Sequence, residues 1–264
     1  MSQAKPRYRL IACEVLAREC AAAISTCAAV VDAEFLPKGL HDVGEERMSS
    51  RVQAAIDATD PGYDAILLAY GLCNYGVRGL HAEVPLVLPR AHDCITLLLG
   101  SRQRYAEYFA GNPGTFFKSP GWIERDSDPN ANPASITARL GMSRDRETLV
   151  AQYGEENADF LMDTLSDWLQ NYRKVAFIDT GVGDTAHYLA VVEDQARERG
   201  WEMEQVAGSR VLLERLLSGQ WSEEDFLVLA PGAQVAASWD EGIICSELSR
   251  PGLSTSPDKG GRGA

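Results

Sequence analysis

The stretch that most constrains the fold is residues 85–102, PLVLPRAHDCITLLLGSR. It opens with an apolar run typical of a buried strand and closes with the apolar pattern of a helix. His92, Asp93 and Cys94 stand between the two. In α/β proteins, ligands bind where the carboxyl end of a strand leads into a helix. The stretch therefore predicts an α/β fold with a functional site at a strand end.

Apolar runs and helical patterns alternate along most of the chain, which predicts parallel sheets covered by helices. The predicted strands lie at 8–13, 31–36, 64–70, 84–89, 174–179, 201–207 and 225–232. The predicted helices lie at 15–29, 45–58, 95–109, 143–153, 155–172, 185–199 and 209–219. Residues 111–142 are rich in Gly, Pro, Asn and Ser, and we expect this segment to consist mainly of loops.

The last third of the chain resembles the first. RLIACE lines up with KVAFID, DAEFLPKG with EMEQVAGS, and YDAILLAYG with EDFLVLAPG. Such self-similarity is typical of a duplicated unit, and it predicts a bilobal molecule with two Rossmann-like halves and a cleft between the lobes. The predicted domains are a first half at 1–110, a loop-rich and helical connecting segment at 111–172, a second half at 173–249 and a disordered tail at 250–264.

The charge and hydrophobicity of the chain disfavour several classes of binding partner. The 264 residues carry a formal net charge of −13, which argues against binding to nucleic acid or to anionic membrane surfaces. No apolar run approaches the roughly 20 residues that cross a bilayer. The opening MSQAKPRYRL lacks the apolar stretch of a secretory signal. We therefore expect a cytoplasmic protein that binds a small molecule.

The cysteines are the residues that point to chemistry. A cytoplasmic location disfavours disulfides, and without a CxxC motif any metal site must be assembled by the fold. Cys20 and Cys27 lie on the apolar side of a predicted helix, which indicates that they pack in the core. No pattern around Cys245 points to chemistry, so we expect it to be structural. The remaining cysteines and two histidines follow predicted strands: Cys13, Cys73, Cys94, His41 and His92.

This set of side chains suits a metal ion. Cys13 and Cys94 precede predicted helices, where the helix dipole favours a thiolate. In an extended stretch, residues two apart point to the same side, so His92 and Cys94 are expected to reach one ion. Zinc takes tetrahedral Cys and His ligands. We expect zinc bound by Cys13, Cys73 and Cys94, with His41 or His92 as fourth ligand; the alternative is that these are buried packing residues and loop histidines.

Other residues are candidates for catalysis or cofactor binding. Asp93 and Lys118 are the candidate catalytic side chains, and Lys118 lies in GTFFKSPGW, which predicts either a lid over the cleft or a packed loop. The segment DTGVGDT, residues 179–185, joins a strand to a helix, where backbone N–H groups can receive an anion; a tight turn is the alternative. The candidate cofactor-binding glycines are Gly71, Gly181 and Gly183.

Three blocks of the sequence, YGLCNYGVRGL, PRAHDCITLLLGSR and GTFFKSPGW, resemble the signature blocks of the domain-of-unknown-function family numbered 1638. The likeness runs from about Leu10 to Pro231, with Asn74 where the family pattern has a glycine. Members are often found among genes for corrinoid-dependent methyl transfer, which implies one-carbon metabolism. The resemblance implies these motif positions: Cys13, Cys73, Asp93, Cys94, Gly100, Ser101 and Trp122.

The expected function is a Cys/His-ligated metalloenzyme that acts on a small molecule in the interlobe cleft. Its most specific version is zinc-dependent or corrinoid-linked methyl transfer, with a corrinoid protein or a methyltransferase as partner. One alternative is an iron–sulfur protein whose three cysteines hold a cluster with one open iron. Another is a non-catalytic protein that binds or delivers a metal or a corrinoid.

Overall fold

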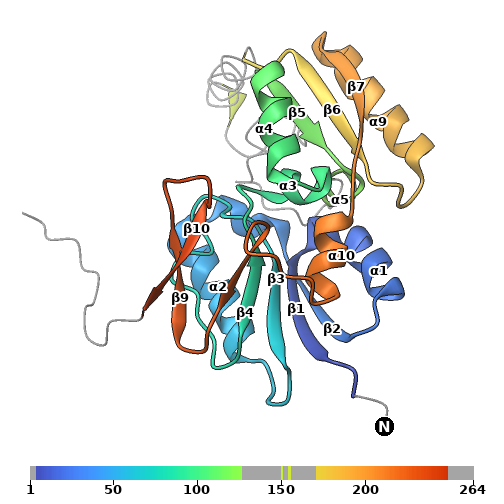
Figure 1. The fold of residues 1–264 in the computed structure, drawn as a ribbon. Helices are drawn as coiled ribbons and strands as arrows, with labels where there is room; N and C mark the ends of the chain where they lie inside the picture. The colour runs from blue at the N-terminus through green and yellow to red at the C-terminus, as the bar shows by residue number, and fades with distance from the viewer. Residues whose placement is uncertain (1–3, 127–149, 151–153, 156–170, 249–264) are drawn as a thin grey trace, which may run out of the picture.

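A computed structural model describes residues 4–126, 150, 154–155 and 171–248. These residues form a five-stranded sheet, a three-stranded sheet above it in Figure 1, and a two-stranded hairpin. The α/β class with parallel sheets is confirmed. No helix in the described part of the chain is long and apolar enough to cross a membrane.

The first sheet carries the residues on which the site prediction rests. Its strand order is β2, β1, β3, β4, β8, in which the first four strands are parallel and β8 is antiparallel to β4. Every residue of β3 and β4 is buried, as expected of strands that are covered on both faces. The strands are β1 (Arg7–Cys13), β2 (Val30–Leu36), β3 (Ala65–Ala69), β4 (Leu86–Pro89) and β8 (Phe226–Leu229).

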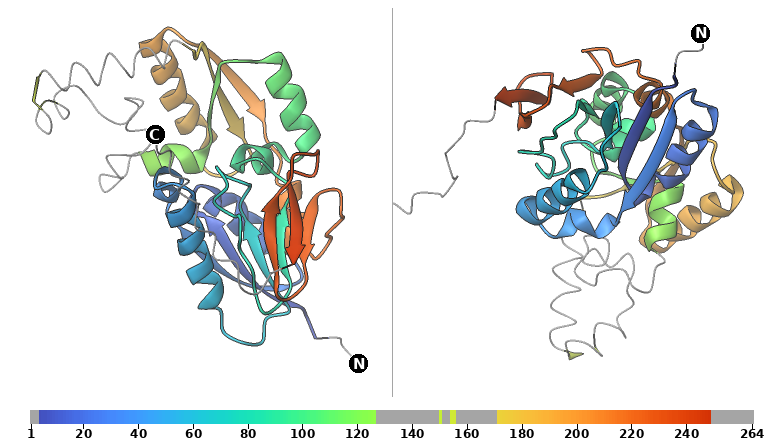
Figure 2. Two further views of the ribbon diagram at one scale, coloured as in Figure 1. Left: turned by 90° about the vertical axis from the view of Figure 1, so that its left-hand side faces the viewer. Right: turned by 90° about the horizontal axis from the view of Figure 1, so that it is seen from below.

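Helices cover both faces of this sheet. The chain moves from β1 to β2 on one side and from β2 back to β3 on the other. Right-handed crossovers therefore place α1 (Ala17–Thr26) and α2 (Glu45–Asp57) on opposite faces, and α10 (Val211–Leu217) packs beside α1 (Figures 1 and 2). Two short 3₁₀ helices follow the carboxyl ends of β1 and β2: η1 (Glu14–Leu16) and η2 (Lys38–Asp42).

The second sheet is smaller and wholly parallel, in the order β5, β6, β7. These strands are β5 (Thr115–Lys118), β6 (Lys174–Asp179) and β7 (Glu202–Ala207), and α9 (Thr185–Arg199) packs on β6 and β7. Its own core includes Phe177, Tyr188 and Val192. In Figure 1, α3 (Cys94–Leu99) and α5 (Pro120–Asp126) lie between the two sheets, and α4 (Arg102–Gly111) stands beside β5.

The predicted duplication is not confirmed, because the two sheets differ in strand order. β1 pairs with β2 in parallel as β6 pairs with β7. The predicted counterpart of β3, at 225–232, instead forms β8, antiparallel beside β4 in the first sheet. The prediction of two superposable halves is therefore wrong in its third strand. Periodicity marks a segment as a buried strand but does not say which sheet its backbone pairs with.

The hairpin of β9 (Ala233–Ala237) and β10 (Ile244–Leu248) was not predicted and follows β8 directly. Backbone hydrogen bonds tie β9 to the segment after β3: Gly79 N–H donates to the Val235 carbonyl at 2.7 Å, and Val235 N–H donates to the Leu80 carbonyl at 2.9 Å. The Arg90 guanidinium donates to the Gly242 carbonyl in the turn at 3.1 Å. The hairpin is thus fastened to the first sheet.

Two other expectations are corrected. The predicted helix at 95–109 is two helices, because Gly100 adopts a φ of 87° and the Ser101 side chain accepts from the Arg104 N–H to start α4. The segment at 111–142 was expected to consist mainly of loops, yet residues 115–126 form β5 and α5. Most of the predicted helices at 143–153 and 155–172, and the predicted tail at 250–264, lie outside the described residues.

A buried carboxyl group joins the first sheet to the second. Glu19 on α1 is fully buried, and its Oε1 accepts a hydrogen bond of 2.7 Å from the hydroxyl of Thr180, the residue after β6. Its Oε2 has no hydrogen-bond partner. Burial raises the pKa of Glu19 above its ordinary value, and the Thr180 hydrogen bond opposes this shift. The folded chain therefore holds this proton more tightly than the unfolded chain does.

The raised pKa makes a prediction for Glu19→Gln. A carboxyl group with a raised folded-state pKa costs stability as pH rises from its unfolded pKa, about 4.3, through its folded pKa. The amide of the variant does not titrate. The stability of the wild type relative to Glu19→Gln should therefore fall as pH rises through that window and then level off. Urea denaturation of both proteins from pH 4.5 to 8 measures this; a pH-independent difference would contradict the assignment.

Candidate functional site

The strand order brings three thiols to one edge of the first sheet. Cys13 ends β1, Cys73 follows β3 and Cys94 follows β4, and these strands are neighbours in the order β1, β3, β4. The carboxyl ends of parallel strands meet at one edge, where strand spacing is about 4.8 Å. The three cysteines therefore follow three adjacent strands. All three cysteines are buried and none forms a disulfide.

The loops after β3 and β4 continue the pairing of their strands. Leu72 N–H donates to the Ala91 carbonyl at 2.8 Å, and Cys73 N–H donates to the His92 carbonyl at 2.9 Å. Gly71 permits this approach, since a Cβ there would lie 2.6 Å from the backbone nitrogen of Asp93. Gly71 thus has a structural reason to be glycine: it lets the two loops touch.

Cys73 opens a left-handed turn of the backbone. Cys73, Asn74 and Tyr75 have φ values of 45°, 55° and 66°. This conformation costs L-residues roughly 1–2 kcal/mol each, with Asn among the residues that tolerate it best. The glycine of the family pattern at position 74 is thus replaced by a residue that accepts the same conformation. Backbone strain of this kind gathers at functional sites, and here it lies at a thiol.

Within the predicted metal set, Cys13 and His41 are in contact, with their Sγ and Nε2 atoms 3.5 Å apart. Burial raises the pKa of the Cys13 thiol to about 12. Burial, and then the charge of Lys38, lower the pKa of His41 to about 4. At neutral pH the pair is therefore an uncharged thiol beside an uncharged imidazole. The expected preference for thiolate at helix starts is outweighed by burial, which also raises the pKa of Cys94 in the first turn of α3.

The three thiols influence one another. The pKa of Cys94 is raised by burial and then by electrostatic interactions with Asp93, Cys73 and Cys13. Burial and then Cys13 raise the pKa of Cys73. Tyr70, directly before Gly71, is buried, and its hydroxyl has no hydrogen-bond partner; after burial, Cys13 and Cys73 are the main causes of its raised pKa. The three thiols and the Tyr70 hydroxyl are thus buried, electrostatically coupled and uncharged at neutral pH.

The two predicted histidines have different surroundings. His92 is exposed and stacks on Tyr105, with ring centroids 5.7 Å apart. Cys94 is buried, and its sulfur accepts from the Trp122 indole N–H at 3.4 Å. The expectation that the His92 and Cys94 side chains point to the same side is therefore wrong. It required an extended backbone through Cys94, but α3 already begins at Cys94. Of the two alternatives for a fourth ligand, the structure places His41 beside a thiol.

Asp93 is held in place from three sides. Its Oδ1 accepts from the backbone N–H groups of Ile95 (3.0 Å) and Thr96 (3.3 Å), which caps α3. The Tyr105 hydroxyl donates to its Oδ2 at 3.1 Å. Burial is the main cause that raises the pKa of Asp93, against these hydrogen bonds. The carboxyl group is thus fixed in position while its charged form is disfavoured.

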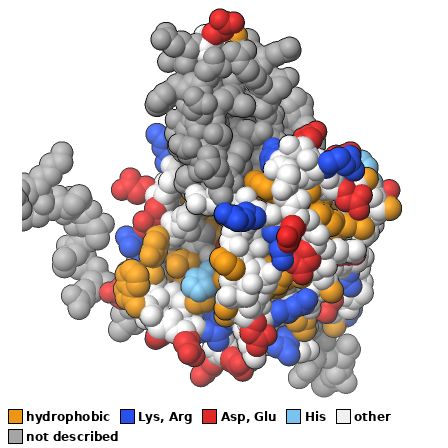
Figure 3. Space-filling view, turned by 90° about the horizontal axis from the view of Figure 1, so that it is seen from above, with side chains coloured by type: hydrophobic (Ala, Val, Ile, Leu, Met, Phe, Trp, Pro, Cys, Tyr) orange, Lys and Arg blue, Asp and Glu red, His pale blue; other side chains and the backbone are white. Residues whose placement is uncertain are grey.

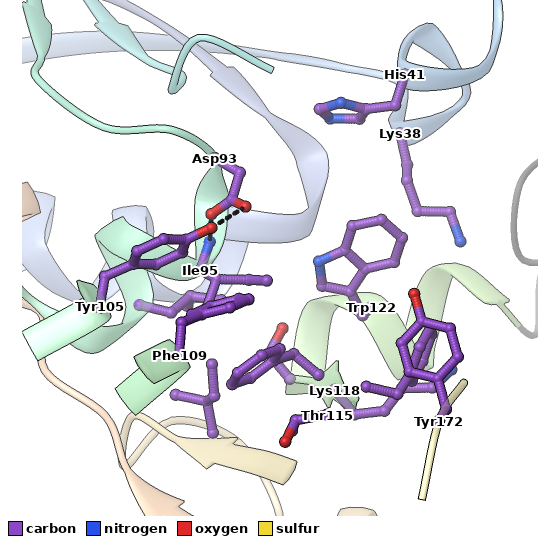
Figure 4. Close-up of a pocket in the computed structure, with 15 residues that line it drawn as sticks. Lys38, His41, Asp93, Ile95, Tyr105, Phe109, Thr115, Lys118, Trp122 and Tyr172 are labelled. Atoms are coloured by element: carbon purple, nitrogen blue, oxygen red, sulfur yellow. Dashed lines mark hydrogen bonds between the residues drawn. The ribbon is translucent and has the colours of Figure 1, made fainter. Parts of the chain in front are cut away.

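A pocket of about 310 Å³ lies beside Asp93, and residues from segments around both the first and the second sheet line it. Figure 4 shows Asp93 and Tyr105 on one side, with His41, Lys38 and Trp122 on the other. None of the three thiols lines the pocket, but Cys13 contacts the lining residue His41 and Cys94 contacts the lining residue Trp122. The remaining lining residues are Ile95, Leu98, Phe109, Thr115, Phe116, Phe117, Lys118, Ser119, Tyr172 and Ile178.

Lys118 lines this pocket from the end of β5 and is buried, so it belongs to the sheet and not to a loop. Its Nζ lies 5.5 Å from the centre of the Phe116 ring. The cleft predicted between two equivalent halves is not confirmed. The pocket is instead formed by segments that follow strands of the first sheet and by β5 and α5.

Gly181 and Gly183, the glycines of the segment at 179–185, do not line this pocket. Gly183 lines a second cavity, of about 660 Å³, together with residues of α1 and α5. The Gly181 N–H donates to the Asp179 carboxylate at 2.9 Å, and the Asp184 side chain accepts from His187 N–H at the start of α9. Donors that an anionic cofactor would use are therefore engaged by carboxylates. The structure does not bring this segment to the thiols.

Within the described ranges, no group of three or more His, Cys, Asp or Glu side chains stands at the spacing that would hold a metal ion. Sequence reasoning also missed Tyr70, Tyr105 and Ser119 as members of the site. Tyr70 ends the buried run before Gly71, and Ser119 follows Lys118, so both lay beside residues already singled out. Tyr105 carried no such signal, because only the fold brings α4 over the loop after β4.

On the solvent side, charges of both signs are interspersed over the described face seen from above (Figure 3). Lys and Arg side chains do not gather there into one basic patch.

The contact of Gly71 with the loop after β4 makes a prediction. Gly71→Ala should lower the free energy of unfolding by about 1–3 kcal/mol, because backbone atoms must shift to admit the Cβ. Gly111→Ala is the matched control: a Cβ at this end of α4 would meet nothing within 4 Å, and stability should stay equal or rise by up to about 1 kcal/mol. Urea denaturation measures both. Equal stability of the two variants would mean that the loops do not depend on this contact.

Comparison with known proteins gives a family but no activity. No curated protein and no solved structure matches the chain. The family model described as Protein of unknown function (DUF1638) matches residues 35–217, more than half of the 264 residues. The matched region contains the loops of Cys73 and Cys94, the pocket-lining residues and the second sheet. The chain therefore belongs to the DUF1638 family.

Proposed function

We propose that this protein is a metal-dependent enzyme that acts on a small molecule in the 310 Å³ pocket, with Cys13, Cys73, Cys94 and His41 as metal ligands. The observation that carries the proposal is the 3.5 Å distance between Cys13 Sγ and His41 Nε2. Zinc–sulfur bonds of about 2.3 Å and zinc–nitrogen bonds of about 2.0–2.1 Å put two tetrahedral ligands about 3.6 Å apart. The pair thus has the separation of two ligands of one zinc ion.

The donor types support zinc. Thiolates and imidazole are the ligands that zinc prefers. The raised pKa values of Cys13, Cys73 and Cys94 mean that the thiols keep their protons at neutral pH in the absence of a cation. A divalent ion takes the place of those protons, so its binding is coupled to their release. The lowered pKa of His41 keeps the imidazole in the neutral form that ligates metal.

The proposal requires Cys73 and Cys94 to approach the Cys13–His41 pair, because no three donors in the described residues are at coordination spacing. The left-handed turn at Cys73 supports such a shift. Its three residues with positive φ store backbone strain, and a movement that relaxes the turn also moves the thiol. The buried Tyr70 hydroxyl, without a partner, adds a polar group that gains from an ion or its ligands nearby.

The position of the pair connects the metal to the pocket. His41 lines the pocket and Cys13 contacts His41, so an ion bound by both would lie at the pocket wall. Zinc held there supplies Lewis acidity and stabilises thiolate at neutral pH. Asp93 lines the same pocket with a raised pKa and a fixed orientation. It is the group that we assign to proton transfer with the substrate, since such perturbed carboxyl groups in pockets are typical of catalytic sites.

The size of the pocket decides how a corrinoid enters the proposal. A volume of about 310 Å³ is at the lower end of the range for ligand pockets and suits a small molecule better than a corrin macrocycle. In the methyl-transfer version of the function, the corrinoid is therefore held by a partner protein. The substrate alone occupies the pocket between the two sheets.

Metal analysis of cysteine variants tests the proposal. Protein purified without oxygen should contain about one zinc per chain, and Cys13→Ala and Cys94→Ala should lose it. Cys20→Ala is the matched control, because Cys20 is equally buried but packs in α1. It should keep the zinc and lose stability through the cavity that it leaves. Elemental analysis and circular dichroism give the two readouts.

Three other results have distinct meanings. Iron with acid-labile sulfide and a brown colour would support the iron–sulfur alternative on the same three cysteines. A folded protein that contains neither zinc nor iron after purification without oxygen would contradict both metal proposals. Loss of metal in Cys20→Ala with retention in Cys94→Ala would show that the ligands have been assigned to the wrong cysteines.

A further inference from the structure

One wall of the pocket is a row of stacked aromatic rings. The Tyr105 and Phe109 ring centroids are 4.3 Å apart with planes 28° from parallel. Phe109 and Phe117 follow at 5.1 Å and 26°, and His92 extends the row beyond Tyr105. Tyr105, Phe109 and Phe117 all line the pocket. The row runs from the loop after β4, along α4, to β5.

Core packing accounts for Tyr105 and Phe117, which pack against the main hydrophobic core, but not for Phe109. α4 buries none of its residues completely, and Phe109 is 37% exposed. On the other side of the pocket stand Trp122 and Tyr172 (Figure 4). Aromatic side chains thus face the pocket from two sides, which is the arrangement that holds a flat ring by offset stacking.

The pocket also has a polar group that the protein leaves unused. Ser119 is fully buried and lines the pocket, and its hydroxyl has no hydrogen-bond partner. A buried hydroxyl in this state costs free energy, and a ligand oxygen that accepts its proton would remove that cost. Lys118, the preceding residue, also lines the pocket and carries a positive charge.

We propose that the pocket binds a small aromatic carboxylate, with its ring between the Tyr105–Phe109 wall and Trp122 and its carboxylate at Ser119 and Lys118. This inference rests on the proposed function in one respect: it names the substrate class of that enzyme. The binding itself needs no metal. A pocket of about 310 Å³ accommodates a single substituted ring.

Calorimetric titration of the full chain, as purified, with benzoate and with cyclohexanecarboxylate tests the inference. Both probes carry the same charge, and only benzoate is flat and aromatic. Benzoate should bind more tightly, by about 3- to 10-fold, since stacking contributes beyond area burial. Benzylamine, with a ring and a positive charge, should not bind detectably because it places an ammonium group beside Lys118.

Two variants and a control locate the binding. Phe109→Leu should weaken benzoate binding by about 3- to 10-fold and leave cyclohexanecarboxylate nearly unchanged. Ser119→Ala should weaken both acids by about 2- to 10-fold without loss of stability, because the wild-type hydroxyl makes no hydrogen bond within the protein. Phe35→Leu is the control: Phe35 on β2 is also 37% exposed but lies outside the pocket, and the variant should bind as the wild type does.

Several results would overturn the inference. They are equal affinity for the two acids, absence of benzoate binding at millimolar concentrations, and an effect of Phe35→Leu as large as that of Phe109→Leu. The metal content of the same preparations separates this inference from the proposed function. Zinc without benzoate binding would remove the substrate class alone, whereas benzoate binding without any metal would remove the metalloenzyme and leave the aromatic site.

Discussion

The site depends on one close backbone contact, where the loop after β3 crosses the loop after β4 at Gly71 and Asp93. The missing side chain at Gly71 lets the Cys73 N–H reach the His92 carbonyl at 2.9 Å. That hydrogen bond sets Cys73 beside the start of α3, and thereby beside Cys94. It also fixes the extended backbone from which the Asp93 side chain caps α3 and meets Tyr105. The positions of the Cys73 thiol and of the Asp93 carboxyl group therefore depend on this contact.

Burial keeps the three strand-end thiols protonated at neutral pH. Desolvation raises the pKa of each strand-end cysteine and lowers that of His41, so the cluster is neutral and makes few of the hydrogen bonds that buried polar groups usually make. Under the proposed function a divalent ion replaces these protons, so metal binding is coupled to proton release. The same burial keeps Cys20 neutral without any such role, so burial alone does not distinguish a ligand from a core residue.

The pocket is built from parts that are distant in sequence. The first sheet supplies His41 and Asp93, α4 supplies the aromatic row, and the segment of β5 and α5 supplies Lys118, Ser119 and Trp122. The Thr180–Glu19 hydrogen bond of 2.7 Å joins the second sheet to α1. Because β5 belongs to the second sheet, the placement of its residues against Asp93 depends on how the two sheets pack.

The sequence predicts strands β1 to β4 and helices α1 and α2 close to their observed bounds, and it predicts that Cys13, Cys73 and Cys94 stand at strand ends. Alternation of β and α elements limits the strand order enough for β1, β3 and β4 to be neighbours. Three features are visible only in the folded chain: residues 226–229 pair with β4, β5 forms inside a segment rich in loop residues, and His41 rather than His92 contacts a thiol. The physical reason is range: periodicity and turn residues report on the nearest few positions, whereas the pairing of an edge strand and the direction of a loop side chain are set by contacts with distant segments.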